Sequence, residues 1–419
     1  MPRFYLGRPS GRPQISVEFC RRSRLTRRLA FLASAAFLVS TNTFAVAQQS
    51  TAPVSPARAQ VQLLVARGVQ ALQSGQNSDA EKDFRRALAI APRSVEILND
   101  LAISLVKQDK LADAVPLYRR ALAIQPGDPA TTRNLALDYF KQQKYAQALP
   151  LFESLKKRNA SDFQAVDLAG LSLFGLNEYP QAAIYLEQAS RLQPSDLLTL
   201  YMLGQAYLRS AKYQAVTDVF ARIMAINPNS AEAHVMMGTA FDKTFQVDKA
   251  IAEYQAAERA NPNFAGVHSG LGLLYWKRNE IDKAEAEFRE ELKRFPSDPV
   301  SNCLLGQIAM LRDDPAEART LFQAALAANP SYKEALFGLG KAEVKLDEPE
   351  RALGPLRKAI RIDANYAEAH YMLGTALAKL GRTAEAEKER SISVAIQTKQ
   401  QEDYAKKLSQ SSSHSRTEK

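Results

Sequence analysis

The chain has 419 residues, of which 24% are charged, and a formal net charge of +10. Most of that excess lies at the N-terminus, because residues 1–47 contain eight arginines and one acid. The remainder is nearly balanced, so charge gives little support to a nucleic-acid partner. Only Cys303 lies beyond residue 47, which excludes a framework of internal disulfides.

Residues 1–47 are typical of a secretory signal peptide. A basic stretch precedes the apolar run Leu29–Ser40, and Ala45-Val46-Ala47 supplies the small residues of a cleavage site. We therefore expect cleavage after Ala47 and export to the periplasm or the medium. The arginine pairs Arg21-Arg22 and Arg27-Arg28 also leave a twin-arginine route open.

The alternative is an uncleaved segment that anchors the protein in the inner membrane. The charge-free span 29–47 is barely long enough to cross a bilayer, and its polar residues 40–43 weaken it. A mitochondrial presequence should be amphipathic rather than a solid apolar block. Residues 48–60 are polar with two prolines, and we expect them to form a flexible linker.

Residues 61–400 are one 34-residue unit repeated ten times. A proline recurs on a single lattice at Pro92, Pro126, Pro194, Pro228, Pro262, Pro296 and Pro330. When this proline is numbered position 32, the repeats begin at residues 61, 95, 129, 163, 197, 231, 265, 299, 333 and 367, with no insertion. Internal repetition at such a period is the signature of a solenoid.

Each repeat has the pattern of a helical hairpin. Positions 4, 7, 8 and 11 share one face of a first helix, and positions 20, 24 and 27 share one face of a second. Position 8 is glycine or alanine in all ten repeats, and position 20 is alanine in all but one, where Val216 stands. These small residues allow the helices to approach closely, and a large apolar residue at position 24 fills the adjacent space.

The ends of the helices are also marked. Proline at position 32 ends the second helix. Six repeats place a good N-cap residue at position 34, before the next first helix: Ser94, Asp128, Asp162, Asp196, Ser230 and Asp298. Pro129 and Pro299 follow two of these caps at the first helical position, where a missing N–H costs nothing.

This pattern closely resembles the tetratricopeptide repeat family, over about five-sixths of the chain. The resemblance implies an all-α, right-handed superhelical solenoid of about ten helix hairpins, with a concave groove that holds a peptide or a partner protein. Both ends depart from the pattern, with Arg67 in the first repeat and Arg390 and Ser393 in the tenth, as a capped monomeric array requires. We expect residues 401–408 to complete a C-terminal capping helix and residues 409–419 to form a disordered tail.

The sequence offers no candidate for catalysis, metal binding or a cofactor. His234, His268 and His370 all fall at position 4, where other repeats have leucine, so we interpret them as packing residues. Equivalent helices lie too far apart for these histidines to share a zinc ion, whose ligands lie at about 2 Å. Gly338-Leu339-Gly340-Lys341 lacks the remaining glycine of a phosphate loop. We therefore expect a protein that is not an enzyme.

In this family positions 2, 5, 9, 12 and 13 of the first helix line the groove. Here they include Leu137, Phe140, Leu171, Phe174, Tyr201, Leu208, Leu273, Trp276, Met310, Phe337, Val344 and Tyr371. We expect this row to bind the partner, with Trp276 as its strongest contact. The alternative is that positions 9 and 12 partly pack against the adjacent first helix.

Position 13 is basic in seven repeats: Lys107, Lys141, Arg209, Lys243, Lys277, Lys345 and Lys379. These cations could complement the C-terminal dipole of each first helix. Alternatively, they form a ladder of positive charge for an acidic partner segment. A carboxylate clamp of this family needs lysine and asparagine at positions 5 and 9, where this chain has Val65 and Val69, or Asn99 and Ile103. Asn134 is the one match to the clamp, so we do not predict that function.

The predicted function is a non-catalytic scaffold that binds a partner segment in the groove during cell-envelope assembly or export. The alternative is the substrate-docking subunit of a separate enzyme, such as a glycosyltransferase. A weaker third reading is a self-assembling array, against which Arg390 and the charged last helix argue. The expected partner is a protein or peptide, and contact with a membrane is expected only if the N-terminal segment is uncleaved.

Overall fold

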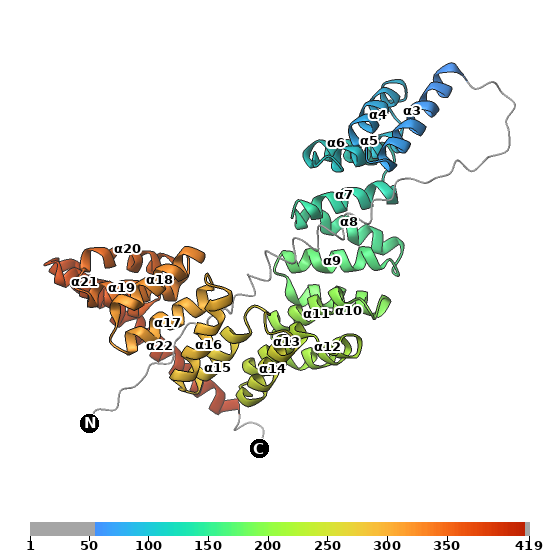
Figure 1. Ribbon diagram of the computed structural model, residues 1–419. Helices are drawn as coiled ribbons and strands as arrows, with labels where there is room; N and C mark the ends of the chain where they lie inside the picture. The colour runs from blue at the N-terminus through green and yellow to red at the C-terminus, as the bar shows by residue number, and fades with distance from the viewer. Residues whose placement is uncertain (1–54, 415–419) are drawn as a thin grey trace. The chain divides into compact units, whose positions relative to one another are not determined.

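The computed structural model describes residues 55–414, so the predicted signal peptide and most of the predicted linker lie outside the described residues. The described part consists of helices joined by short turns, with no strand (Figure 1). None of the helices searched in this part is both long and apolar enough to span a bilayer. The all-α solenoid expected from the repeats is confirmed.

The helices fall into two compact units that divide between Thr244 and Phe245. The N-terminal unit contains α3 (Pro56–Gln73), α4 (Asn77–Ile90), α5 (Val95–Val106), α6 (Leu111–Ile124), α7 (Pro129–Lys141), α8 (Tyr145–Arg158), α9 (Phe163–Gly175), α10 (Tyr179–Leu192), α11 (Leu197–Arg209), α12 (Tyr213–Ile226) and α13 (Ala231–Lys243). The C-terminal unit contains α14 (Val247–Ala260), α15 (Val267–Lys277), α16 (Ile281–Arg294), α17 (Pro299–Leu311), α18 (Pro315–Ala328), α19 (Lys333–Lys345), α20 (Pro349–Ile362), α21 (Ala367–Lys379) and α22 (Thr383–His414). Odd-numbered helices are the first helices of the repeats, and even-numbered helices are the second.

The two ends of the array differ from the predicted boundaries. Helix α3 begins at Pro56 rather than near residue 61, because the Ser55 side chain accepts a hydrogen bond from the Arg58 N–H and caps it. Helix α22 continues to His414, so the tail predicted to be disordered from residue 409 is helical over its first part. Thr398 stands at position 32 of this repeat, but Ala160 and Ala364 stand there in two earlier repeats whose second helices, α8 and α20, end at Arg158 and Ile362, so the missing proline alone does not explain the longer helix.

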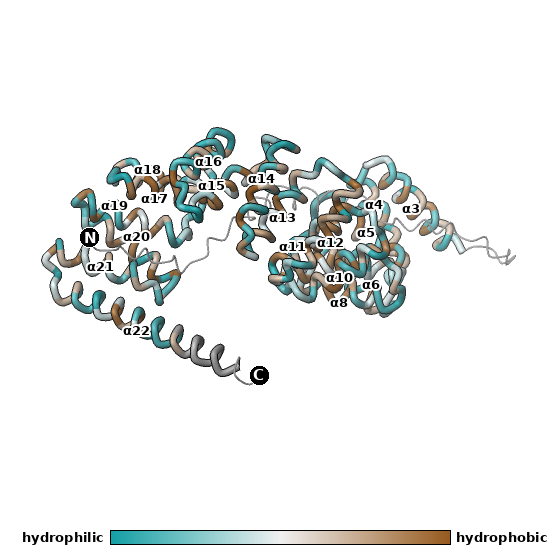
Figure 2. Tube along the Cα trace, turned by 90° about the horizontal axis from the view of Figure 1, so that it is seen from below, coloured by the Kyte–Doolittle hydropathy of each residue, from teal (hydrophilic) through white to brown (hydrophobic). Residues whose placement is uncertain are grey.

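The close approach of the two helices at position 8 is confirmed. A Cβ built on Gly272 would lie 2.5 Å from the Phe288 ring, and one on Gly306 would lie 2.8 Å from the Phe322 ring. Both rings are fully buried. Figure 2 shows that apolar and hydrophilic stretches alternate along the helices.

The fifth repeat is an exception to the predicted filling of position 24. Phe220 is only half-buried and lies against His234, with ring centroids 5.5 Å apart. The space beside Gly204 is taken instead by the Met236 sulfur, with Val219 next to it. Val216, which replaces the usual alanine at position 20 in this repeat, is fully buried.

The turn between the two helices has the same backbone conformation in all ten repeats. Position 15 has a positive φ each time, with glycine only at Gly75 and Gly381. The following residue donates its N–H to the carbonyl five residues earlier, as in the 3.0 Å bond from Lys110 to Leu105. In the sixth repeat this strained position holds Phe245, which is 88% exposed.

All six predicted N-caps are confirmed. The side chains of these residues each accept a hydrogen bond from the backbone N–H three residues ahead, and they are Ser94, Asp128, Asp162, Asp196, Ser230 and Asp298. Pro129 and Pro299 occupy the first helical position, as expected. The first helices are therefore positioned by local sequence signals.

We predict opposite effects for alanine at two helical glycines of the C-terminal unit. Gly272→Ala should lower the free energy of unfolding by ~1–3 kcal/mol, because the new Cβ overlaps the Phe288 ring. Gly354→Ala in α20 should raise it by ~0.5–1 kcal/mol, because nothing lies within 4 Å and alanine favours the helix. Chemical denaturation followed by circular dichroism measures both, and equal effects would contradict the packing described here.

Candidate first-helix binding face

The first helices of neighbouring repeats contact one another within each unit. Their positions 5, 9, 12 and 13 share one side of the helix. We call the surface made by these positions the first-helix face. It is the surface on which the sequence places the partner, and the two units present it differently.

In the N-terminal unit the first-helix face is largely closed. Every residue of 97–106 in α5 and of 165–174 in α9 is buried. Phe140 and Phe174, at position 12, pack edge-on against Tyr145 and Tyr179, with ring centroids 5.3 Å and 5.1 Å apart. The expectation of an exposed aromatic row is therefore wrong for these two, because position 12 points towards the start of its own second helix.

Position 5 also makes a recurrent packing contact, with the residue at position 34 that precedes the next first helix. Tyr201 is 9% exposed, and its hydroxyl lies 2.6 Å from the Ser230 hydroxyl. Arg133 pairs with Asp162 at 2.5 Å in the third repeat. The expected exposure of Tyr201 is therefore also wrong, since its side chain fills the junction between two repeats.

In the C-terminal unit the first-helix face is open in part, although Leu273, Cys303 and Val344 on it are buried. Trp276, Met310 and Phe337 are half-buried on α15, α17 and α19. The Phe337 ring packs on Tyr366 at 5.1 Å, which leaves its other side outward. Tyr371 on α21 is 55% exposed, and position 34 of its repeat, Gln400, lies within α22 instead of in a turn before another first helix.

Sequence reasoning missed Leu311, which is 61% exposed at the end of α17. It stands at position 13, where seven other repeats have a basic residue. An exposed leucine in place of a cation is a departure that the sequence alone displays. Leu311 extends the apolar strip formed by Trp276, Met310, Phe337 and Tyr371, and we call these five residues the apolar strip.

The basic residues at position 13 are largely engaged within the protein. Lys379 lies 2.6 Å from Asp347, and Lys345 pairs with Asp313 in the same way. Each of these aspartates is the positive-φ turn residue of the preceding repeat. Neither the helix-dipole interpretation nor the charge-ladder interpretation of position 13 included this ion pair. Lys379 also donates a hydrogen bond to the Val344 carbonyl, near the end of the preceding first helix.

The other predicted cations lie in varied surroundings. Burial lowers the pKa of Lys141, and the charge of Asp109 in the preceding turn opposes that shift. Arg209 is exposed and lies 5.9 Å from the Tyr179 ring centroid. Lys243 is half-buried and Lys277 is exposed. These groups do not form one uniform ladder of positive charge.

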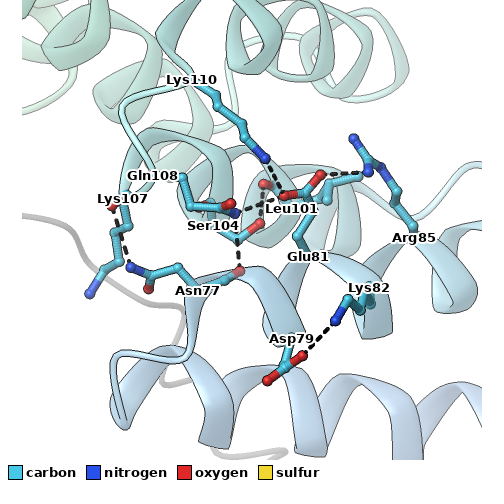
Figure 3. Close-up of polar contacts among 10 residues, drawn as sticks. All are labelled: Asn77, Asp79, Glu81, Lys82, Arg85, Leu101, Ser104, Lys107, Gln108 and Lys110. Carbon is cyan, nitrogen blue, oxygen red and sulfur yellow. Dashed lines mark hydrogen bonds and ion pairs between the residues drawn. The ribbon is translucent and has the colours of Figure 1, made fainter.

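Neighbouring repeats are joined by polar contacts away from the first-helix face. Figure 3 shows Glu81 of α4, which accepts from Gln108 at 2.8 Å and from Lys110 at 3.0 Å across the first junction. Burial raises the pKa of Glu81, but these hydrogen bonds outweigh it and hold the pKa below the ordinary value. The equivalent junctions pair Glu285 with Arg312, and Arg319 with Glu348.

The histidines at position 4 are packing residues, as expected, and two of them also contact a glutamate. His268 Nδ1 lies 2.8 Å from Glu287, and His370 Nδ1 lies 2.6 Å from Glu389. The hydrogen bond from Glu287 raises the pKa of His268 against the opposing effect of burial. Among the residues searched, no group of three or more His, Cys, Asp or Glu side chains could hold a metal ion.

The repeats match models of known protein families. A tetratricopeptide repeat model matches residues 65–129, 168–231, 235–299 and 303–367, which together exceed half of the chain. The chain belongs to the tetratricopeptide repeat family. A second tetratricopeptide repeat model matches residues 356–388, and a model of anaphase-promoting complex, cyclosome, subunit 3 matches residues 107–189. Membership of the family supports a protein–protein interaction scaffold.

No curated protein sequence matches the chain. Among solved structures, the Cut9–Hcn1 tetramer of APC/C is similar at 17% identity and a TM-score of 0.47, covering 80% of this chain and 73% of that one. Yeast Tom70 is similar at 14% identity and a TM-score of 0.43, covering 81% and 96%. YrrB, a TPR protein described as having an unusual peptide-binding site, is similar at 18% identity and 0.41, covering 47% and 97%.

We predict that the two classes of aromatic on first helices differ in stability effect. Phe174→Ala should lower the free energy of unfolding by ~3–5 kcal/mol, because the ring is buried against Tyr179. Tyr371→Ala should change it by less than ~0.5 kcal/mol, because most of the ring is exposed. Urea denaturation compares the two variants, and a large loss for Tyr371→Ala would place that residue in the core.

Proposed function

We propose that this protein is a non-catalytic scaffold that binds an apolar segment of a partner protein on the first-helix face of its C-terminal unit. The observation that supports this is the exposure of Leu311 and Tyr371 beside half-buried Trp276, Met310 and Phe337. Equivalent positions in the N-terminal unit, such as Phe140 and Phe174, are buried. A solvent-exposed apolar strip bordered by polar residues is typical of a protein-binding surface.

The physical gain from binding would come from covering these side chains. Removing apolar surface from water contributes roughly 25 cal/mol per Å². Trp276 and Tyr371 are of the residue types that are enriched among interface hot spots. Lys341 is exposed one turn after Phe337 and offers a polar contact at the edge of the strip. We expect the partner segment to present large apolar side chains to α17, α19 and α21.

The experiment that tests this proposal is affinity capture from the envelope fraction of the source cell. Residues 48–419 serve as bait, and mass spectrometry identifies the retained proteins. A protein retained by the wild type should be lost with the double variant Leu311→Ser/Tyr371→Ser. Trp276→Ala should weaken retention, and the captured protein's binding segment can then be located on overlapping peptides. The double variant should melt at the wild-type temperature, because Leu311 and Tyr371 are exposed, whereas Trp276→Ala should melt somewhat lower because Trp276 is half-buried.

The matched control replaces two equally exposed apolar residues outside the strip. Ile184 on α10 and Val394 on α22 are 65% and 62% exposed. The variant Ile184→Ser/Val394→Ser should retain the partner. Retention by the wild type, the Leu311→Ser/Tyr371→Ser variant and the control alike would contradict binding at the apolar strip. Loss of the partner from the control as well would also contradict it.

We further propose that the protein acts outside the cytoplasm, in the assembly of the cell envelope or in export. The support is the basic, then apolar, then small-residue order of residues 1–47. The purified protein from the source cell should begin at Gln48, as read by N-terminal sequencing. A mature chain that retains residues 1–47 in the membrane fraction would instead support the anchored alternative.

A further inference from the structure

Polar atoms without a protein partner are concentrated at one place in the N-terminal unit. Of the described side chains, eleven buried nitrogen and oxygen atoms have no hydrogen-bond partner from the protein. Eight of these eleven belong to α5, α6, α7 and the residue after α7: one atom each of Asn99, Asp100, Tyr118, Thr131, Asn134 and Gln142, and both carboxylate oxygens of Asp138. Such groups are rare in native proteins, so their clustering requires a physical reason.

Two carboxyls and a phenol form the centre of this cluster. Asp100 on α5 is 3% exposed, Asp138 on α7 is 0% exposed, and Tyr118 on α6 between them is 0% exposed. Burial raises the pKa of Tyr118, and the charges of Asp138 and Asp100 raise it further, so the phenol lies near both acids. An ionised carboxylate buried without a partner is costly, which favours the neutral acid.

The surroundings of the two acids determine when they ionise. Burial raises the pKa of Asp100 to about 7, and the charge of Glu96 on the same helix adds to this. Burial raises the pKa of Asp138 to about 6, against the opposing effects of the Gln142 amide and the charges of Lys141 and Lys144. The charged groups that act on these carboxyls are thus Glu96 on α5, Lys141 at the end of α7 and Lys144 at the start of α8.

We propose that Asp100 and Asp138 form a protonation lock that holds α5, α6 and α7 closed in acid and loosens them when both carboxyls ionise. Closing requires both carboxyls to keep their protons, and opening releases these protons to solvent. The first helices α5 and α7 contact each other, so loosening would expose the first-helix face of the second and third repeats. This lock is independent of the apolar strip in the C-terminal unit.

The direction of the pH dependence follows from the raised pKa values. A carboxyl that is harder to ionise in the closed state stabilises that state fully at low pH, and the stabilisation is lost as pH rises through its folded pKa. The stabilisation is therefore lost from about pH 4, the ordinary pKa of a solvated aspartate, up to about pH 6 for Asp138 and about pH 7 for Asp100. At alkaline pH the closed state must contain two buried negative charges near one phenol.

The experiment is hydrogen–deuterium exchange of the protein from residue 48 between pH 5.5 and 8, with rates corrected for intrinsic exchange. Protection of residues 95–141 should fall by roughly tenfold or more across this range. Protection of α12 should stay nearly constant, because its one carboxyl, Asp218, is exposed. In the double variant Asp100→Asn/Asp138→Asn, which keeps both side chains neutral, residues 95–141 should stay protected at every pH.

The matched control is Asp113→Asn, which removes an exposed aspartate from α6 and should keep the wild-type pH profile. If the double variant does not fold, the single variant Asp138→Asn and the wild-type profile decide the question. A pH-independent wild type, a fall shared equally by α12, or a double variant that loses protection like the wild type would each overturn the lock.

Discussion

The structure depends on how closely two helices approach at position 8 of each repeat. Where glycine stands there, the side chain at position 24 lies against bare backbone, and even a Cβ on Gly340 would come within 2.5 Å of Leu356. This contact fixes the rotation of the first helix about its axis. The direction of positions 5, 9, 12 and 13 is consequently fixed too. The first-helix face therefore derives its geometry from the contact at position 8. The fifth repeat illustrates the dependence, because one larger residue, Val216, coincides with the displacement of Phe220.

The same repeat produces two chemically different faces in the two units. In the N-terminal unit, side chains at positions 5 and 12 fold back onto neighbouring helices, and acids such as Asp100 and Asp138 are enclosed. In the C-terminal unit, Val344 at position 12 is buried, but Trp276, Met310 and Phe337 are half-buried and Tyr371 is exposed. The difference lies in side chains rather than in the backbone, since first helices of both units end in the same positive-φ turn. A family that keeps its packing positions and varies the others can therefore place an open surface in only part of its array.

Local and periodic signals predicted most of the fold from the sequence. The 34-residue lattice, the six N-caps and the glycine contacts at position 8 each depend on residues close in sequence or repeated at fixed offsets. The candidate site was less predictable, because exposure at positions 5 and 12 depends on a second residue that varies, such as Tyr179 for Phe174. Pairwise comparison of the repeats would have helped: glutamate occurs at position 23 in the same three repeats that have histidine at position 4. The positive-φ turn is marked by glycine only at Gly75 and Gly381, but five more repeats have Asn or Asp there, the other residue types that favour this conformation, so comparison of position 15 would have indicated it.

The junction contacts give the array an order that its backbone does not impose. Glu81 and Glu285 present negative charge to the following repeat, whereas Arg319 presents positive charge to Glu348. Loss of the eighth repeat by recombination would place Glu285 opposite Glu348, and two carboxylates would then meet at one junction. Solenoid genes gain and lose whole units readily, yet in this protein the adjoining charges make some of those events costly. The number and sequence of repeats are thus constrained by electrostatic matching between neighbours, independently of any partner.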